Sequence, residues 1–172
     1  SSVSWSYPAA DTWPPALNEG GVYKVRARAR DRSQNSEAYV ERQFTYDNYS
    51  PTTTVTMPGA AAYASMPYIK GDFTEAVSGI NPGNGIQIAV KGNSDSTWWD
   101  GNVWISTGFA VTNWRNASNI YSSSWTYANA ALNNYFNTLA GSREFTAYVR
   151  GLDVVGNKNA PDKLLVTIAK LL

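Results

Sequence analysis

The sequence predicts an all-β fold, an antiparallel β-sandwich, and three observations support this. Aromatic residues are abundant, with Trp 7 and Tyr 11 among 172 residues, whereas charged residues make up only 16%. Glycine (13) and proline (8) recur between short segments that are rich in β-branched and aromatic residues. Within several of these segments apolar and polar residues alternate, as they do in a strand with one buried face. This composition is typical of a turn-rich extracellular module.

The alternation predicts eight strands, at 22–30, 37–46, 52–57, 63–70, 85–91, 102–107, 144–152 and 163–169. The clearest is GIQIAVKG, which places Ile86, Ile88 and Val90 on one side. Turn residues separate the strands at 78–79, 81–85, 100–101 and 156–157. Residues 127–141 are ambiguous, because the spacing of their apolar residues suits either a short helix or an irregular crossover between sheets. In either case the apolar face would be lined by Ala130, Leu132, Phe136 and Leu139.

An internal repeat organises the chain. A shift of 122 residues pairs Tyr23 with Phe145, Val25 with Ala147, Asp31 with Asp153 and Asn35 with Asn157. Upstream, SWSY at 4–7 matches SWTY at 124–127 with a shift of 120, so the loop that follows differs by two residues. We therefore expect two copies of one unit, of which the first has only its C-terminal half.

The repeat predicts two domains. Residues 1–48 form a partial unit with a linker, and residues 49–172 form a complete β-sandwich unit. Pro51 marks the boundary, because it fixes its own φ and biases Ser50 to extended geometry. The second copy ends in VTIAKLL without a similar linker, and we expect it to be the terminal repeat.

Composition excludes several functions. A net charge of +1 gives no global field for nucleic acid or for an anionic membrane, and no apolar run is long enough for a membrane span. The absence of Cys and His excludes disulfides, Ser-His-Asp catalysis and His-ligated metals. Asp72 and Glu75 are the closest carboxylate pair on a strand-to-turn segment, and nothing indicates a cleft around them. We do not expect an enzyme.

A basic stripe stands out in the first copy, where Lys24, Arg26, Arg28 and Arg30 alternate with apolar residues. An anionic partner is one interpretation. The other is a solvated strand face, with Glu37 and Glu41 opposite as exposed cross-strand pairs. The second copy replaces the basic residues with Thr146, Tyr148 and Arg150, which favours the solvated face.

The tryptophans suggest a glycan-binding platform. Its candidate residues are Trp98, Trp99, Trp104 and Trp114. The alternative is a hairpin at Asp100-Gly101 with core packing, in which one of the two adjacent indoles is buried because neighbours in a strand point to opposite faces.

Calcium is the one cofactor that the sequence leaves open. Asp31, Asn35 and Asp47 could converge near the domain boundary and supply oxygen ligands. The alternative is that Asp-x-x-x-Asn closes a turn through side-chain-to-backbone bonds.

The partial first copy predicts an assembly surface. Two strands alone are marginal in water, and they would expose Tyr23, Val25, Val40 and Phe44. The segment is a remnant of a longer array, packs against its neighbour, or is completed by strands from another chain.

The string W-x-Y … Y-x-V-x-A-x-A-x-D-x-x-x-N, followed by D-N-x-x-P-T-T-T-V, resembles the bacterial immunoglobulin-like repeats of large surface proteins and adhesins. The resemblance implies an immunoglobulin-like sandwich at the bacterial cell surface. Ser33-Gln34 replaces the glycine that such turns carry, and the WWDGNVW insert lies outside the motif.

We therefore expect a structural or adhesive module that spaces or assembles a surface fibre. Its partners would be neighbouring repeats or like subunits, joined by strand complementation. The alternative function is a carbohydrate-binding module for surface glycans that uses exposed tryptophans. Buried indoles would favour the spacer, and exposed coplanar indoles the carbohydrate-binding module.

Overall fold

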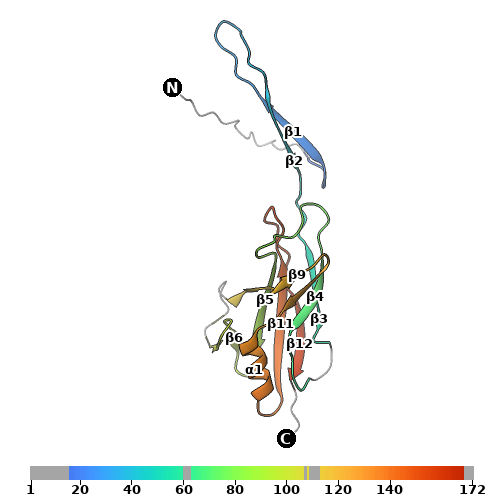
Figure 1. The fold of residues 1–172 in the computed structure, drawn as a ribbon, viewed down its shortest axis with the longest axis vertical. Coiled ribbons are helices and arrows are strands. Elements are labelled where there is room, and N and C mark those ends of the chain that lie inside the picture. Colours follow the sequence, from blue (N-terminus) through green and yellow to red (C-terminus); the bar gives the residue numbers. More distant parts are fainter. Residues whose placement is uncertain (1–15, 60–62, 107, 109–112, 169–172) are drawn as a thin grey trace. The chain divides into compact units, whose positions relative to one another are not determined.

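The computed structural model describes residues 16–59, 63–106, 108 and 113–168, with residues 164–166 described by their backbone alone. The chain divides into two compact units, Ser1–Asn48 (unit 1) and Tyr49–Leu172 (unit 2). Figure 1 shows that strands dominate both units, and they pair in antiparallel sheets. The all-β prediction is confirmed.

Unit 1 contains an antiparallel hairpin of β1 (Val22–Ala27) and β2 (Val40–Thr45). The rings of Tyr23 and Phe44 stack across it with centroids 5.7 Å apart. Gly21 is required beside them, because a Cβ there would lie 2.7 Å from the Tyr23 ring. Both strands are shorter than the sequence predicted. Beyond them, Arg30 and Ser36 form an isolated bridge that leads into the turn.

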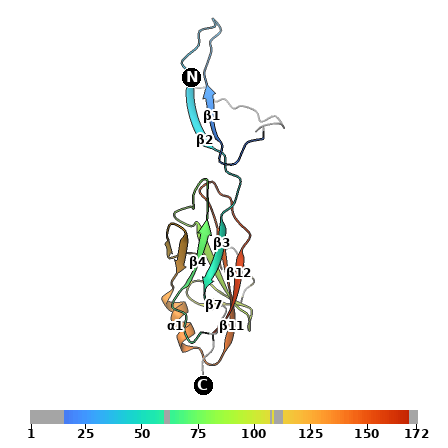
Figure 2. The same cartoon turned by 90° about the vertical axis from the view of Figure 1, so that its right-hand side faces the viewer.

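Unit 2 contains two sheets, seen from the side of β3 and β4 in Figure 2. The first has the order β3 (Thr52–Met57), β4 (Ile69–Thr74), β10 (Ser124–Tyr127), β9 (Asn119–Ile120). The second has the order β12 (Asp162–Ile168), β11 (Arg143–Gly151), β5 (Ile86–Gly92), β6 (Thr97–Trp99), β7 (Trp104–Ile105). A further short strand, β8 (Arg115–Asn116), also pairs with β5.

The two sheets enclose one hydrophobic core. The first sheet contributes Ile69, Phe73 and Trp125, and the second contributes Ile88, Val90, Phe145 and Val149. Trp125 and Val149 are completely buried, whereas their neighbours Thr126 and Tyr148 are half-buried. This alternation is the period of a strand with one face on the core, and each large apolar side chain so buried contributes about 1.5–3 kcal/mol.

The strand expected at 63–70 was wrong in position. Tyr63 makes only an isolated parallel bridge to Ile168, and the strand β4 begins at Ile69. Pro67 separates the two, since it lacks the N–H that a ladder needs. The strand expected at 102–107 is likewise reduced to β7, because Asp100 accepts hydrogen bonds from the amides of Asn102 and Val103 and holds them in a turn. The antiparallel pairing of β6 with β7 confirms the alternative of a hairpin at Asp100-Gly101. The strands β8, β9 and β10 were not predicted.

The ambiguous segment contains a helix, α1 (Ala130–Thr138). The Asn129 side chain caps it by accepting a hydrogen bond from the Leu132 amide at 2.8 Å. Leu132, Phe136 and Leu139 are buried, but Ala130 is exposed, so its predicted place in the lining was wrong. No helix among the described residues is long and apolar enough to cross a membrane.

Candidate functional site

The hairpin of unit 1 and the last hairpin of unit 2 pair in the same register. In unit 1 the ladder runs from Val22 opposite Thr45 to Ala27 opposite Val40. In unit 2 a shift of 122 residues gives Glu144 opposite Thr167 and Val149 opposite Asp162. Every intervening pair is shifted by the same amount. Because a slip of one residue would turn each side chain to the other face, this agreement fixes the same facing pattern in both hairpins.

The turns beyond the two hairpins share their hydrogen bonds as well. Asp31 accepts from the backbone amide and the side-chain amide of Asn35, at 2.9 Å each. Asp153 accepts from the same two groups of Asn157, at 2.8 Å each. In each turn the aspartate amide also donates to the asparagine carbonyl. Both Asp-x-x-x-Asn motifs are therefore closed turns in the structure.

Two further features recur at the same shift. Ala29 donates its amide to the Glu37 carboxylate at 2.8 Å, and Gly151 donates to the Asn159 side chain at 2.5 Å. The residue before the asparagine has a positive φ in both turns, +74° at Gln34 and +102° at Gly156. A glutamine in this region is strained, whereas glycine is not.

The three residues predicted as a calcium site do not lie together. Asp31 and Asn35 occupy the tip of the hairpin, while Asp47 follows β2 at its opposite end. The six-residue ladder between the two ends has a length of roughly 20 Å, at about 3.3 Å per residue. Hydrogen bonds from the side chain and then the backbone of Asn35 hold the pKa of Asp31 below its usual value. The predicted convergence was wrong, because it ignored the length of the strands.

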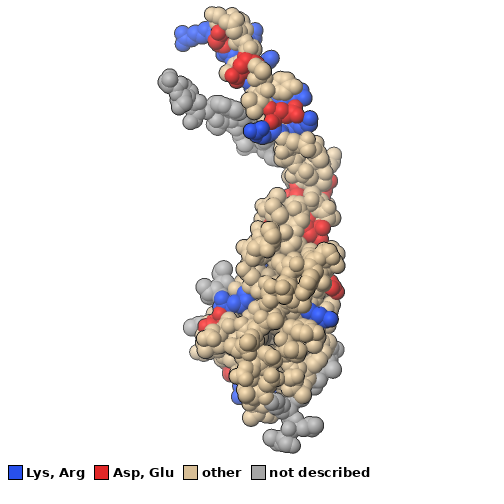
Figure 3. All heavy atoms as spheres, viewed as in Figure 1, with Lys and Arg blue, Asp and Glu red and all other residues tan. Residues whose placement is uncertain are grey.

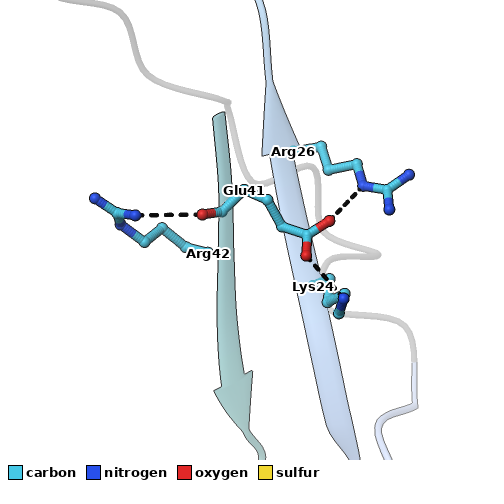
Figure 4. A network of polar contacts seen from close by, with 4 residues as sticks. All are labelled: Lys24, Arg26, Glu41 and Arg42. Carbon is cyan, nitrogen blue, oxygen red and sulfur yellow. Dashed lines mark hydrogen bonds and ion pairs between the residues drawn. The ribbon is translucent and has the colours of Figure 1, made fainter. Parts of the chain in front are cut away.

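The basic stripe is partly neutralised across the hairpin. The Glu41 carboxylate binds Lys24 Nζ at 2.8 Å and Arg26 Nε at 2.6 Å, as Figure 4 shows. Hydrogen bonds from Lys24 and then Arg26 lower the pKa of Glu41. The pairing predicted for Glu41 is confirmed, but Glu37 bonds to a backbone amide instead. Figure 3 shows basic and acidic side chains close together on unit 1, whereas the visible face of unit 2 is mostly uncharged.

The apolar side of the unit 1 hairpin is open among the described residues. Val25 is 47% exposed, Val40 56% and Phe44 39%, while Tyr23 is half-buried. In unit 2 the residues that correspond to Tyr23, Val25 and Ala27 are Phe145, Ala147 and Val149. Each of these three is at most 2% exposed. Beside Val25 and Val40 lies a hollow of about 890 Å³, whose lining also includes Arg28, Arg30 and Arg42.

The four tryptophans predicted as one platform divide between two faces of the second sheet. Trp99 is 2% exposed, and its ring lies 5.4 Å from that of Trp104, which in turn contacts Phe145. These two indoles belong to the core. Trp98 and Trp114 are half-buried and lie on the opposite face. The four-residue platform was therefore wrong, because the pleat separates adjacent residues.

Three residues that the sequence analysis did not assign to a site accompany Trp98 and Trp114. The Trp98 ring lies 5.5 Å from the ring of Tyr148, and Lys91 Nζ lies 5.8 Å from the Trp98 centroid. The Arg150 guanidinium lies 4.1 Å from the Trp114 centroid. Their period-2 spacing along β11 and β5 was a usable signal, but only the strand pairing shows which rows are adjacent.

Comparisons with family models and with curated proteins find no match to this sequence. The features on which a functional proposal can rest are therefore those of the chain itself. They are the two hairpins of identical register, the open side of the first hairpin, and the outward aromatic side chains of unit 2.

Proposed function

We propose that this chain is a structural module of a bacterial extracellular surface protein or fibre, built from immunoglobulin-like β-sandwich repeats. One observation carries the proposal. The ladder of β1 and β2 is reproduced pair by pair in β11 and β12, together with the Asp-x-x-x-Asn turn. Two hairpins of unrelated origin have no reason to share register, turn closure and a positive φ at one position.

The immunoglobulin-like fold and the location at the bacterial cell surface in this proposal come from the sequence resemblance. In the repeats that the sequence resembles, a Tyr-x-Val strand and an Asp-x-x-Gly-Asn turn precede the last strand. Here β11, the turn at Asp153 and β12 follow that order. Two sheets around one core agree with a sandwich. Sandwich repeats of this kind act by holding and spacing the chain, a role that requires no catalytic group.

We also propose that β1 receives a strand from a neighbouring repeat or a like subunit. In unit 2, β11 pairs with β12 on one side and with β5 on the other. Its counterpart β1 pairs only with β2 within the described part of unit 1. A β5-like strand added antiparallel to β1 would satisfy the free backbone edge. A facing sheet of the same partner, in the place that the first sheet takes in unit 2, would cover Val25 and Phe44, which gives the association a hydrophobic contribution.

Light scattering across a range of concentrations tests this assembly. The mass of residues 1–172 is expected to rise with concentration, whereas residues 49–172 remain monomeric. Val25→Asp should abolish the rise, since it places a charge on the face to be covered. Val154→Asp is the matched control, because Val154 is 55% exposed on a turn of unit 2. A monomer at every concentration, with amide protection throughout 22–46, would contradict strand complementation.

A further inference from the structure

The outer face of the second sheet in unit 2 carries a continuous row of aromatic and basic side chains, which we call the outer-face patch. Direct cross-strand partners share a face, and Trp98 lies opposite Lys91, which lies opposite Thr146. Tyr148 and Arg150 follow on the same side of β11, with Trp114 against Arg150. The patch consists of Lys91, Trp98, Trp114, Tyr148 and Arg150.

The aromatic part of the patch offers flat apolar area beside water. Trp98 and Tyr148 are both half-buried, and their rings are tilted by 37° to one another. Such rings have an apolar body and a polar group, Nε1 or OH, that can donate a hydrogen bond. A pyranose ring combines an apolar face with equatorial hydroxyls, so this combination suits sugar rings. Ala89, which lies opposite Tyr148, is only 1% exposed, so the larger side chains of the patch close over it.

The basic part of the patch is held in place by its neighbours. Arg150 donates from Nε to Gln87 Oε1 at 2.8 Å, and its guanidinium lies over the Trp114 ring. Burial lowers the pKa of Arg150, but an arginine stays charged at neutral pH. A planar guanidinium fixed in this way suits a carboxylate, which it can bind through two parallel hydrogen bonds.

The charges around the patch are mostly positive. Lys163 is exposed and lies opposite Tyr148 on β12. Glu144, two residues before Thr146 on β11, is a carboxylate on the same face, and Asp95 pairs with Arg143 at 3.6 Å. Three cations therefore lie around the rings of Trp98 and Tyr148: Lys91 and Arg150 of the patch, and Lys163 beside it. This surface complements a chain of sugars that carry negative charge at intervals.

We propose that the outer-face patch binds an acidic polysaccharide, a chain of uronic acid residues whose carboxylates meet Arg150 and Lys91 while sugar rings stack on Trp98 and Tyr148. The other polyanion with stackable rings is single-stranded nucleic acid. It usually takes a longer basic groove than these three cations provide. The proposal is independent of the structural function above, since it uses unit 2 and neither β1 nor β2.

The test is titration of the full chain with an oligomer of galacturonic acid, followed by calorimetry and by tryptophan fluorescence. The matched probe is the same oligomer with its carboxylates methyl-esterified. The acidic oligomer is expected to bind about tenfold or more tightly than the ester, because its hydrogen bonds to Arg150 are charge-assisted. Its affinity should fall as salt is added. Equal affinity for the two oligomers, or no binding of the acidic one, would overturn the proposal.

Two variants assign the binding to the patch. Trp98→Ala should abolish the fluorescence change and the binding, whereas Tyr121→Ala, which removes a 56% exposed ring from the loop after β9, should leave both unchanged. Arg150→Gln should weaken binding of the acidic oligomer about tenfold and leave any binding of the ester unaltered. Lys70→Gln, on an exposed position of β4, is the charge control.

Thermal unfolding of each variant separates loss of binding from loss of fold. If Trp98→Ala does not fold, Arg150→Gln decides the test, because it removes the charge and still offers N–H donors through its carboxamide. Unchanged affinity in folded Trp98→Ala or Arg150→Gln would place the binding elsewhere and overturn the proposal. So would tighter binding of oligothymidylate than of the uronate oligomer. The assembly measured by light scattering depends on Val25 and not on the patch, so the two proposals fail separately.

Discussion

Asn35 closes a ring on Asp31, donating its backbone amide to one carboxylate oxygen and its side-chain amide to the other, at 2.9 Å in both cases. The same ring between Asn157 and Asp153 ends the last hairpin of unit 2. The difference lies in burial, since Asp31 is exposed and Asp153 is completely buried. The aspartate of the Asp-x-x-x-Asn turn is therefore exposed to water in unit 1 and buried in unit 2.

The buried ring should matter more to stability than the exposed one. Asn157→Ala removes one donor from the buried Asp153 carboxylate, and we expect unit 2 to lose about 1–3 kcal/mol of unfolding free energy. Asn35→Ala should change the hairpin much less, because water replaces the lost bond. Urea unfolding followed by tryptophan fluorescence measures the first effect, and hydrogen exchange of residues 22–45 the second. Equal effects at the two sites would contradict the role of burial.

The positive φ before each asparagine predicts opposite effects of reciprocal substitutions. Gly156→Gln should destabilise unit 2 by about 1–2 kcal/mol, the cost of the left-handed conformation for a residue with a Cβ. No described atom lies within 4 Å of a Cβ at this position, so the backbone alone carries the cost. Gln34→Gly should relieve the same strain and increase amide protection in the unit 1 hairpin. Gly156→Ala serves as the control, since it tests φ without a long side chain.

The contacts of Glu41 predict a loss of hairpin stability in acid. Lys24 and Arg26 hold the pKa of Glu41 below its usual 4.5. A carboxyl group whose pKa is lower in the folded state contributes stability above the unfolded pKa and loses it as the pH falls through the folded pKa. Amide chemical shifts of 22–27 and 40–45 should therefore change below about pH 4.5, the usual pKa of a glutamate. In Glu41→Gln this pH dependence should be absent, and its persistence would assign the transition to another group.

The cap of α1 also positions the loop between β6 and β7. Asn129 accepts from the Leu132 amide and donates from Nδ2 to the Gly101 carbonyl at 2.9 Å. Asn129→Ala should cost unit 2 about 1–2 kcal/mol, because both bonds are lost. Asn129→Asp keeps the acceptor and loses the donor, so its cost should be smaller. Thermal unfolding compares the two variants, and the same melting temperature for both would exclude a contribution from the cap.

The sequence by itself determined the local features of this protein. Alternation placed Ile86, Ile88 and Val90 on one buried side, and each is at most 2% exposed. The shift of 122 residues identified the two Asp-x-x-x-Asn segments, whose turns are closed by side chains within five consecutive residues. Such features depend on neighbours in the chain, and a short segment contains all the atoms that decide them.

Only the tertiary structure decided which outward and inward residues meet. Trp98 and Trp99 are adjacent in the sequence, and either could have faced the core; the pairing of Trp98 with Lys91 turned Trp99 inward. The contact of Trp98 with Tyr148 joins residues that are 50 positions apart, across β5. The predicted convergence of Asp31, Asn35 and Asp47 was wrong for the same reason, since strand length separates Asp31 from Asp47. Long-range pairing sets these distances, because it depends on the register between strands rather than on the composition of any one strand.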